Sequence, residues 1–289
     1  LDTVPNHMSI AGRGNRWWWD VLRNGLASEY ARYFDVDWEP PEVRLRNTLL
    51  LPILADQYGR ALERGEIKLH RDGPAFTVKY KDHEFPVEPR SLAGLFRVAG
   101  QGISSELLAF IADAFELLPS PTETNPQAVE RRRRDDRVAT ELLQSLLDTE
   151  PEAGRALDRA VGACNANPDS LARLVEQQNY RLAWWQAAER DLGYRRFFDV
   201  NSLIGLRMEV PEAFAAAHRL TFELVRSGAA DGLRIDHVDG IQDPLAYLQA
   251  LREQCPVYTI VEKILQDEER LPDAWPVDGT SGDDFLNLV

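Results

Sequence analysis

The stretch GLRIDHVDG, residues 232–240, decides the fold. It begins as a short apolar strand and ends in charged residues. VYTIVEKIL, residues 257–265, repeats this pattern after a predicted helix over residues 244–254. Short apolar strands that alternate with helices are typical of a parallel sheet or barrel, and such folds bind ligands at the carboxyl ends of their strands. The sequence therefore predicts an α/β fold with its functional site at the ends of these two strands.

Two carboxylates stand at these predicted strand ends. Side chains alternate along a strand, so Arg234 and Asp236 project on the same side. An adjacent arginine favours the ionised form of a carboxyl group, which suits a carboxylate that attacks as an anion. Glu262 follows one strand–helix–strand unit later. Two carboxyl groups that face one site fit glycoside hydrolysis or transfer, and retaining chemistry requires them roughly 5–5.5 Å apart.

Two other interpretations of these residues compete with catalysis. Asp236 and Glu262 can be structural carboxylates in ion pairs with Arg234 and Lys263, and the strand pattern does not separate this role from the catalytic one. The DHVD sequence also resembles a loose cluster of metal ligands. No second group of His and Asp stands at ligand spacing, so we expect no metal, and no cofactor either.

The first residues, DTVPNH at 2–7, form an extended segment that a proline turn stops. This turn places Asn6 and His7 at the carboxyl edge of a strand. An amide and a neutral imidazole there can hydrogen-bond to sugar hydroxyl groups. We therefore count both residues as candidate substrate contacts.

Charge and composition exclude several classes of protein. The 289 residues hold 33 Lys and Arg against 47 Asp and Glu, a net charge of −14, which argues against a non-specific nucleic-acid binder. No apolar run approaches the ~18–20 residues that span a bilayer, so we expect no membrane partner. The two cysteines, Cys164 and Cys255, cannot form a disulfide framework and suit a reducing cytoplasm.

The chain divides into three expected regions: residues 1–8, 9–200 and 201–289. The middle region should begin with a helix over residues 16–26, broken near Gly25. A hairpin over residues 77–89 should follow, because apolar and polar residues alternate there. The further helices expected in this region cover residues 104–118, 127–147, 152–164 and 169–188.

Some conspicuous residues of the middle region have simpler structural explanations. Trp184 and Trp185 are expected in the core of the last of these helices. The run Arg131–Arg134 is followed by two aspartates, which predicts a solvated helix face with local ion pairs rather than a nucleic-acid site. One of Arg195 and Arg196 is a candidate to brace the functional site, and the sequence does not distinguish them.

DTVPNH, GLRIDHVDG and TIVEKIL, in this order, closely resemble conserved regions of the α-amylase family of glycoside hydrolases. FFDVNSL, residues 197–203, resembles an extra signature of that family. Further motifs extend the resemblance from residue 1 to residue 289: VPNHM, WWWDVL, YARYFDVDWE, QNYRLAWW, YRRFFDVNSL, VEKIL and the tail LPDAWPVDGTSGDDF. It implies a partial (β/α)8 TIM barrel, covering about strands 3 to 5 or 6, with a large, mainly helical insertion. Residues 1–8 would end strand 3, residues 9–200 would form the insertion, and residues 201–289 would carry strands 4 and 5.

The resemblance also implies a role for each candidate site residue. Asp236 matches the nucleophile, Glu262 the general acid/base, and Arg234 the arginine that orients the nucleophile. The family also carries a third essential carboxylate in an Asn-His-Asp-like motif, which does not follow Glu262 in this sequence. We therefore expect an internal segment of a longer enzyme that is inactive alone. The residues expected to bind substrate are Asn6, His7, Arg234, His237, Asp239 and Lys263.

The implied reaction is an intramolecular transglucosylation by a retaining double displacement. It would convert the reducing-end α-1,4 linkage of a maltooligosaccharide into an α,α-1,1 linkage. A trehalose-releasing hydrolase would then act next in the pathway, with no direct complex implied. The alternatives are a hydrolase of the same family that cleaves α-glucans or trehalose-linked glycosides, and a non-catalytic α-glucan-binding protein.

Overall fold

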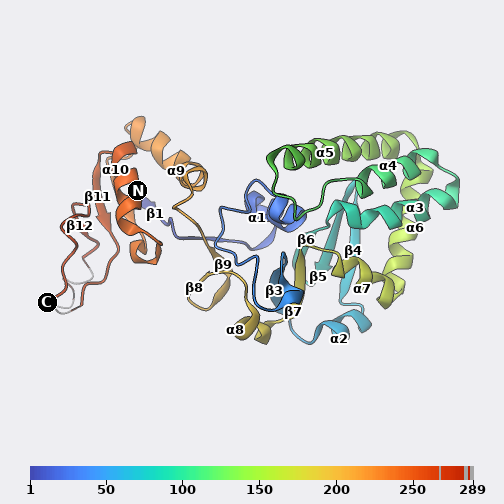
Figure 1. Ribbon diagram of the computed structural model, residues 1–289, viewed down its shortest axis with the longest axis horizontal. Helices are drawn as coiled ribbons and strands as arrows, with labels where there is room; N and C mark the ends of the chain where they lie inside the picture. Colours follow the sequence, from blue (N-terminus) through green and yellow to red (C-terminus); the bar gives the residue numbers. More distant parts are fainter. Residues whose placement is uncertain (267, 283–285, 287–289) are drawn as a thin grey trace. The chain divides into compact units, whose positions relative to one another are not determined.

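The computed structural model describes residues 1–266, 268–282 and 286, so Asp283–Phe285 of the tail motif lie outside the described residues. The chain is an α/β protein of two compact units (Figure 1). In the described residues no helix is both long enough and apolar enough to cross a membrane. Unit 1 comprises Leu1–Ser9, Arg32–Asp35 and Tyr194–Val289, and unit 2 comprises Ile10–Ala31 and Val36–Gly193.

A four-stranded sheet organises unit 1. Its strands are all parallel and lie in the order β1, β10, β11, β12. Along β10, Leu233 and Ile235 are buried while Arg234 is partly exposed, which confirms the predicted alternation. Both predicted strands and the helix between them are confirmed. The bounds are β1 Asp2–Thr3, α9 Pro211–Arg226, β10 Gly232–Ile235, α10 Pro244–Gln254, β11 Tyr258–Val261 and β12 Gly279–Thr280.

A second, antiparallel sheet of unit 1 has the order β2, β9, β8. It joins β2 (His7–Ser9), which follows the proline turn, to the hairpin formed by β8 (Arg196–Phe197) and β9 (Val200–Gly205). His7 faces Gly205 in this register. The FFDVNSL segment is therefore attached to the strand that begins with His7.

Unit 2 contains two further sheets and most of the helices (Figure 1). Strands β3 (Leu49–Leu54) and β7 (Tyr180–Trp184) pair in parallel, and β4 (Ile67–Asp72), β5 (Ala75–Tyr80) and β6 (His83–Pro86) form an antiparallel sheet. The hairpin expected over residues 77–89 is confirmed by β5 and β6. The helices of this unit are α1 Arg16–Asn24, α2 Tyr58–Glu63, α3 Ala93–Ile103, α4 Glu106–Glu116, α5 Pro126–Thr149, α6 Pro151–Ala166, α7 Pro168–Glu176 and α8 Ala188–Asp191.

Local sequence signals set several helix ends. Ser105 caps α4 by accepting a hydrogen bond from the main-chain N–H of Leu108, and Asn125 caps α5 in the same way. Prolines occupy the first turn of α5, α6 and α7, where a missing N–H costs nothing. Helix α1 ends at Asn24, and Gly25 caps it with a φ of 60°, which suits glycine. The expected break of the first helix near Gly25 is thus confirmed.

The helix expected over residues 169–188 is wrong in its second half. Helix α7 ends at Glu176, and residues 180–184 form β7. Tyr180 and Leu182 are buried against β3, so pairing with a distant strand overrides the helical spacing. Trp185 is 53% exposed, which also contradicts its expected place in the core.

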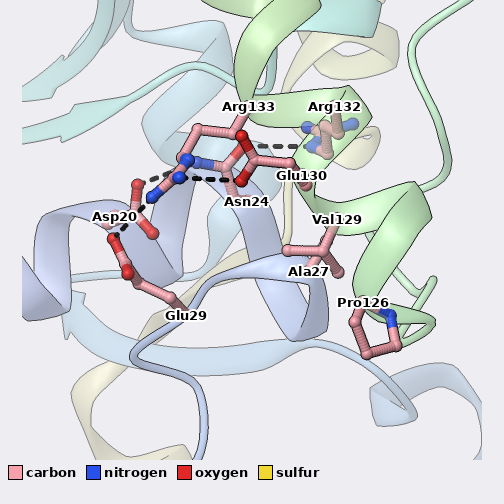
Figure 2. A pocket seen from close by; sticks show the side chains of 9 residues that line it. All are labelled: Asp20, Asn24, Ala27, Glu29, Pro126, Val129, Glu130, Arg132 and Arg133. Carbon is pink, nitrogen blue, oxygen red and sulfur yellow. Dashed lines mark hydrogen bonds and ion pairs between the residues drawn. The ribbon is translucent and has the colours of Figure 1, made fainter.

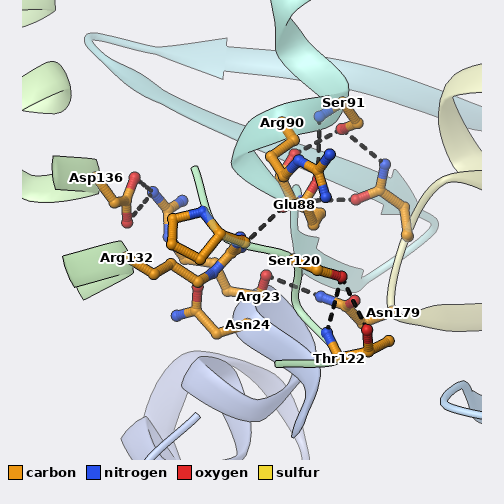
Figure 3. Close-up of polar contacts among 12 residues, drawn as sticks. Arg23, Asn24, Glu88, Arg90, Ser91, Ser120, Thr122, Arg132, Asp136 and Asn179 are labelled. Atoms are coloured by element: carbon orange, nitrogen blue, oxygen red, sulfur yellow. Dashed lines mark hydrogen bonds and ion pairs between the residues drawn. The ribbon is translucent and has the colours of Figure 1, made fainter. Parts of the chain in front are cut away.

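The run Arg131–Arg134 is a solvated face only in part. Arg133 pairs with Glu130 at 2.7 Å and with Glu29 at 3.6 Å (Figure 2). Arg132 instead is 1% exposed and pairs with the buried Glu88 at 2.8 Å (Figure 3). The prediction is therefore wrong for Arg132, because its partner comes from a segment 44 residues away.

The Arg132 guanidinium has partners in three directions. Besides Glu88, it donates to the main-chain oxygen of Pro119 at 2.6 Å and to Oδ1 of Asn24 at 3.0 Å. A buried charge is tolerated when it is paired and hydrogen-bonded in this way. The side chain thus ties three segments of unit 2 together.

Candidate active site

Asp236 and Glu262 occupy equivalent places at the carboxyl edge of the parallel sheet. Each directly follows its strand, and Ile235 and Val261 are register partners. The main-chain N–H of Asp236 donates to Thr3 at 2.9 Å, and that of Glu262 donates to Ile235 at 2.7 Å. The strand ladder thus extends to both residues and fixes their backbones side by side.

One guanidinium spans the two carboxylates. Arg234 Nη1 donates to Asp236 Oδ1 at 2.8 Å and also to Asp2 Oδ1 at 2.8 Å, while Nη2 lies 3.6 Å from Glu262 Oε1. The hydrogen bonds to Asp2 and then to Asp236 raise the pKa of Arg234. Its charge is therefore permanent, and it lies between the two carboxyl groups.

The ion pairs expected for a purely structural site occur only in part. Arg234 pairs with Asp236 as that interpretation requires. Lys263 does not pair with Glu262: its Nζ lies 2.9 Å from Glu269 Oε1 and 3.8 Å from Asp239 Oδ2. Lys263 and Asp239, two expected substrate contacts, thus lie together beside the carboxylate pair rather than within it.

Glu262 is held by main chain as well as by charge. Its Oε2 accepts a hydrogen bond from the main-chain N–H of His237 at 2.9 Å. His237 has a φ of 47°, in the left-handed region that non-glycine residues seldom adopt. Strain of this kind concentrates at functional sites. The turn after β10 therefore presents both Asp236 and a donor for Glu262.

Asn6 and His7 lie in the loop that packs against the turn after β10. Asn6 is 1% exposed, and its Oδ1 accepts a 2.6 Å hydrogen bond from His7 Nδ1. When the His7 ring is neutral and Nδ1 carries the proton, Nε2 can accept a hydrogen bond from another group. Burial lowers the pKa of His7, while the charge of Asp236 opposes this shift. His7 is therefore a neutral imidazole within electrostatic reach of Asp236.

Gly240 allows this close packing. A Cβ atom at Gly240 would lie 2.3 Å from His237 Cδ2 and 2.5 Å from Asn6 Nδ2. Both distances are below any real contact, so a larger residue would displace the two side chains. Gly240 thus brings the turn after β10 against the loop that carries Asn6.

Arg195 braces the site, which resolves the choice between Arg195 and Arg196. Its Nε donates to Asp35 Oδ2 at 2.8 Å, and its Nη2 donates to the main-chain oxygens of Leu206 at 3.0 Å and Asn6 at 3.4 Å. Arg196 instead pairs with Asp199 at 2.9 Å within the hairpin. Arg195 thereby fixes the main chain of Asn6.

Phe197 was missed as a site residue, although its motif was noted. Its ring stacks on His7 with centroids 4.0 Å apart and meets His237 edge-on at 5.1 Å. It therefore separates and orients the two imidazoles. In the sequence, only the resemblance of FFDVNSL to a family signature pointed to this segment. The position of the Phe197 ring between His7 and His237 is visible only in the structure.

In the part of the chain that the structure describes, no group of three or more His, Cys, Asp or Glu side chains is arranged to hold a metal ion. His237 Nδ1 and Asp239 Oδ1 lie 3.7 Å apart, as a weak pair rather than as two ligands. The carboxylates instead surround the guanidinium of Arg234.

Unit 2 has a separate hollow of about 270 Å³ beside α1 and α5 (Figure 2). Asp20 lines it and accepts hydrogen bonds from Ser28 at 2.5 Å and Asn24 at 2.9 Å, while burial raises its pKa. Arg133, also in its wall, is paired with glutamates. Because these charged groups already satisfy one another, the carboxyl edge of the unit 1 sheet is the better candidate site.

Fold and site together define the class: an α/β protein with two carboxylates that share one arginine at the carboxyl edge of a parallel sheet. No protein-family model matches the chain. A protein of Mycobacterium tuberculosis, named as a presumed maltooligosyl trehalose synthase, is 30% identical over 292 residues, which cover 100% of this chain. The chain spans only 26% of that relative's length.

Solved structures give the same answer. The maltooligosyltrehalose synthase from Arthrobacter ramosus is 31% identical, with a TM-score of 0.62 over 97% of this chain and 26% of its own. The DSM5389 glycosyltrehalose synthase is 27% identical, with a TM-score of 0.65 over 99% of this chain and 29% of its own. The resemblance found in the motifs is confirmed: the chain is homologous, over its whole length, to part of the maltooligosyltrehalose synthases.

Proposed function

We propose that this chain carries the nucleophile and the general acid/base of a maltooligosyltrehalose synthase, an isomerase of trehalose biosynthesis. The observation that carries the proposal is the bridge that Arg234 makes between Asp236 and Glu262, in a chain homologous to such synthases. The activity would belong to a protein of the relatives' length, which we call the complete enzyme.

We further propose that unit 1 is part of a (β/α)8 barrel. Strand β1 would end barrel strand 3, and β10 and β11 would be strands 4 and 5, with β12 opening the next unit. Their parallel pairing in chain order, with α9 before β10 and α10 before β11, supports this assignment. Residues 9–200 would then form an insertion after strand 3.

In the first half of the reaction, Asp236 attacks the anomeric carbon next to the reducing-end glucose. The C1–O4 bond breaks while a bond forms between C1 and the carboxylate oxygen, and Glu262 gives its proton to the departing O4. Arg234 orients Asp236 through the hydrogen bond from Nη1 to Oδ1. Neutral His7 can accept a hydrogen bond from a sugar hydroxyl through Nε2, because Asn6 engages Nδ1.

In the second half, the released glucose remains bound and turns over. Its anomeric hydroxyl attacks the glycosyl–enzyme, Glu262 takes up the hydroxyl proton, and Asp236 leaves as a carboxylate. The product has an α,α-1,1 linkage, and both catalytic groups return to their starting state. His237, Asp239 and Lys263 are proposed to contact the substrate beside the carboxylate pair.

The third carboxylate of the α-amylase family is proposed to lie outside these 289 residues, so that the chain alone would not turn over substrate. A maltooligosyltrehalose trehalohydrolase is the proposed pathway partner, without a direct complex. The proposed location is the cytoplasm, which would suit the two unpaired cysteines, Cys164 and Cys255.

Product analysis of the complete enzyme on maltopentaose tests the proposal. A synthase yields a non-reducing isomer of unchanged mass, whereas a hydrolase increases reducing ends and releases shorter sugars. Asp236→Asn should abolish turnover while maltopentaose still binds. Hydrolysis as the main reaction, or unchanged turnover in Asp236→Asn, would overturn the proposal. Binding without turnover by the unsubstituted enzyme would identify a glucan-binding protein instead.

A further inference from the structure

Phe198 is an exposed aromatic residue at the edge of the candidate active site. It lies between β8 and β9, at the tip of the hairpin, and its relative exposure is 74%. Its ring centroid is 4.4 Å from that of Phe197 and 6.0 Å from that of His237. An open ring thus stands beside the histidine that directly follows Asp236.

The backbone of Phe198 is also unusual. Its φ is 48°, in the left-handed region, where Gly, Asn or Asp is normally found. A bulky aromatic residue gains nothing from this turn and is not buried to compensate for the strain. The contacts with Phe197 and His237 hold the ring in place, so the turn presents an apolar face that packing among the described residues does not use.

We propose that Phe198 binds substrate by stacking its ring on the C–H face of a glucosyl unit of an α-1,4-glucan. This inference rests on the proposed function and deepens it. An aromatic face provides a large apolar contact at little cost in conformational entropy, while the polar groups around Asp236 hydrogen-bond to the hydroxyls. The ring would bind the unit beside the one held at Asp236, because it adjoins His237 rather than the carboxylates.

Matched substitutions in the complete enzyme separate binding from packing. Phe198→Asn removes the ring and fits a left-handed backbone, so it should not lower the melting temperature. Phe198→Tyr keeps the ring. Val200→Thr is the control, because Val200 lies on the same hairpin and is 43% exposed. This substitution also removes exposed apolar surface from the hairpin, but it does not remove an aromatic ring.

The readout is the Kd for maltopentaose, measured by calorimetry in an Asp236→Asn background that does not turn over. Phe198→Asn should weaken binding about tenfold, the loss expected for one aromatic stack, whereas Phe198→Tyr and Val200→Thr should stay within about twofold. In the otherwise unsubstituted enzyme, Phe198→Asn should raise KM with little change in kcat.

Three results would overturn the inference. The first is unchanged binding in Phe198→Asn. The second is a fall in kcat without a change in KM, which would make the ring a support for His237. The third is a lower melting temperature in Phe198→Asn that Phe198→Tyr restores, which would show that the ring packs against protein. Failure of the proposed function is distinguishable, because it would appear as turnover in Asp236→Asn.

Discussion

Glu262 Oε2 accepts a hydrogen bond from the main-chain N–H of His237 at 2.9 Å, so the proposed acid/base is oriented by the residue that follows the proposed nucleophile. Its other oxygen lies 3.6 Å from Arg234 Nη2, and Arg234 also holds Asp236. Any shift of the turn after β10 would therefore move both carboxylates together. The relationship shows how two short strands can hold the proposed catalytic pair in a fixed arrangement.

Glu262→Gln in the complete enzyme tests the acid/base role. The amide oxygen can still accept from His237, so the fold should persist, but no proton can be transferred. We expect turnover of maltopentaose to fall by about 10²–10⁴. The first turnover of α-maltosyl fluoride should be largely retained, because fluoride departs without protonation, and it should appear as a burst of released fluoride before the second step stalls. Equal losses in the rate of maltopentaose turnover and in the rate of the fluoride burst would contradict the assignment.

Gly240→Ala tests the close packing at the site. The new Cβ would collide with the His237 ring and the Asn6 amide, at 2.3 and 2.5 Å. Overpacking of this kind costs about 1–3 kcal/mol of stability, and displacement of both side chains should lower kcat/KM about tenfold or more. Gly279→Ala, on β12 of the same sheet, meets no atom within 4 Å and is the control. Similar kinetics in the two variants would argue against the packing role.

His218 should make stability depend on pH. It donates from Nδ1 to the main-chain oxygen of Phe214 at 2.9 Å and accepts from the Tyr247 hydroxyl at Nε2, 2.8 Å away. Burial lowers its pKa below the ordinary 6.5. Between pH 6.5 and the lowered pKa, His218 binds a proton in the unfolded chain but not in the folded chain. The free energy of unfolding therefore falls as the pH drops through this range.

Urea unfolding at pH 7.5 and pH 5.5 measures this effect. The double variant His218→Leu/Tyr247→Phe removes the titrating group without leaving the tyrosine hydroxyl unpaired, so its stability should change less between the two pH values. His7, whose pKa is also lowered by burial, should account for part of the remaining slope. An unchanged pH dependence would show that His218 is not responsible.

The buried Arg132 should be essential for the stability of unit 2. Arg132→Met leaves the carboxylate of Glu88 buried and unpaired, which typically costs about 3–5 kcal/mol. Arg133→Met is a matched control on the same helix, because the Arg133 side chain is 62% exposed and should matter by less than about 1 kcal/mol. Denaturant titrations compare the two, and equal effects would refute the distinction.

The sequence predicted what depends on short-range pattern. Alternation along residues 232–235 and a helix between two strands were enough to place Asp236 and Glu262 at one edge of a sheet. The resemblance to a known family then supplied expected roles for them. Ser105 sets the start of α4 for the same local reason.

Features that depend on distant partners were missed or, as for the choice between Arg195 and Arg196, left open. Arg195 is 189 residues from Asn6, the residue whose main chain it braces. Arg132 cannot be distinguished from its charged neighbours in the sequence, because its partner Glu88 comes from a distant segment. Trp184 kept helical spacing in the sequence, but pairing with β3 placed it in a strand. In each case the residue is stabilised by a contact with a distant segment, which the local sequence pattern does not reveal.

The covalent step at Asp236 is the central claim, and mass spectrometry of the trapped enzyme tests it most directly. The Glu262→Gln complete enzyme should react with α-maltosyl fluoride and then stall, because no base activates the acceptor in the second step. We predict a maltosyl adduct on the peptide that contains Asp236, absent after Asp236→Asn. An adduct on another residue, or fluoride release without any adduct, would contradict the account.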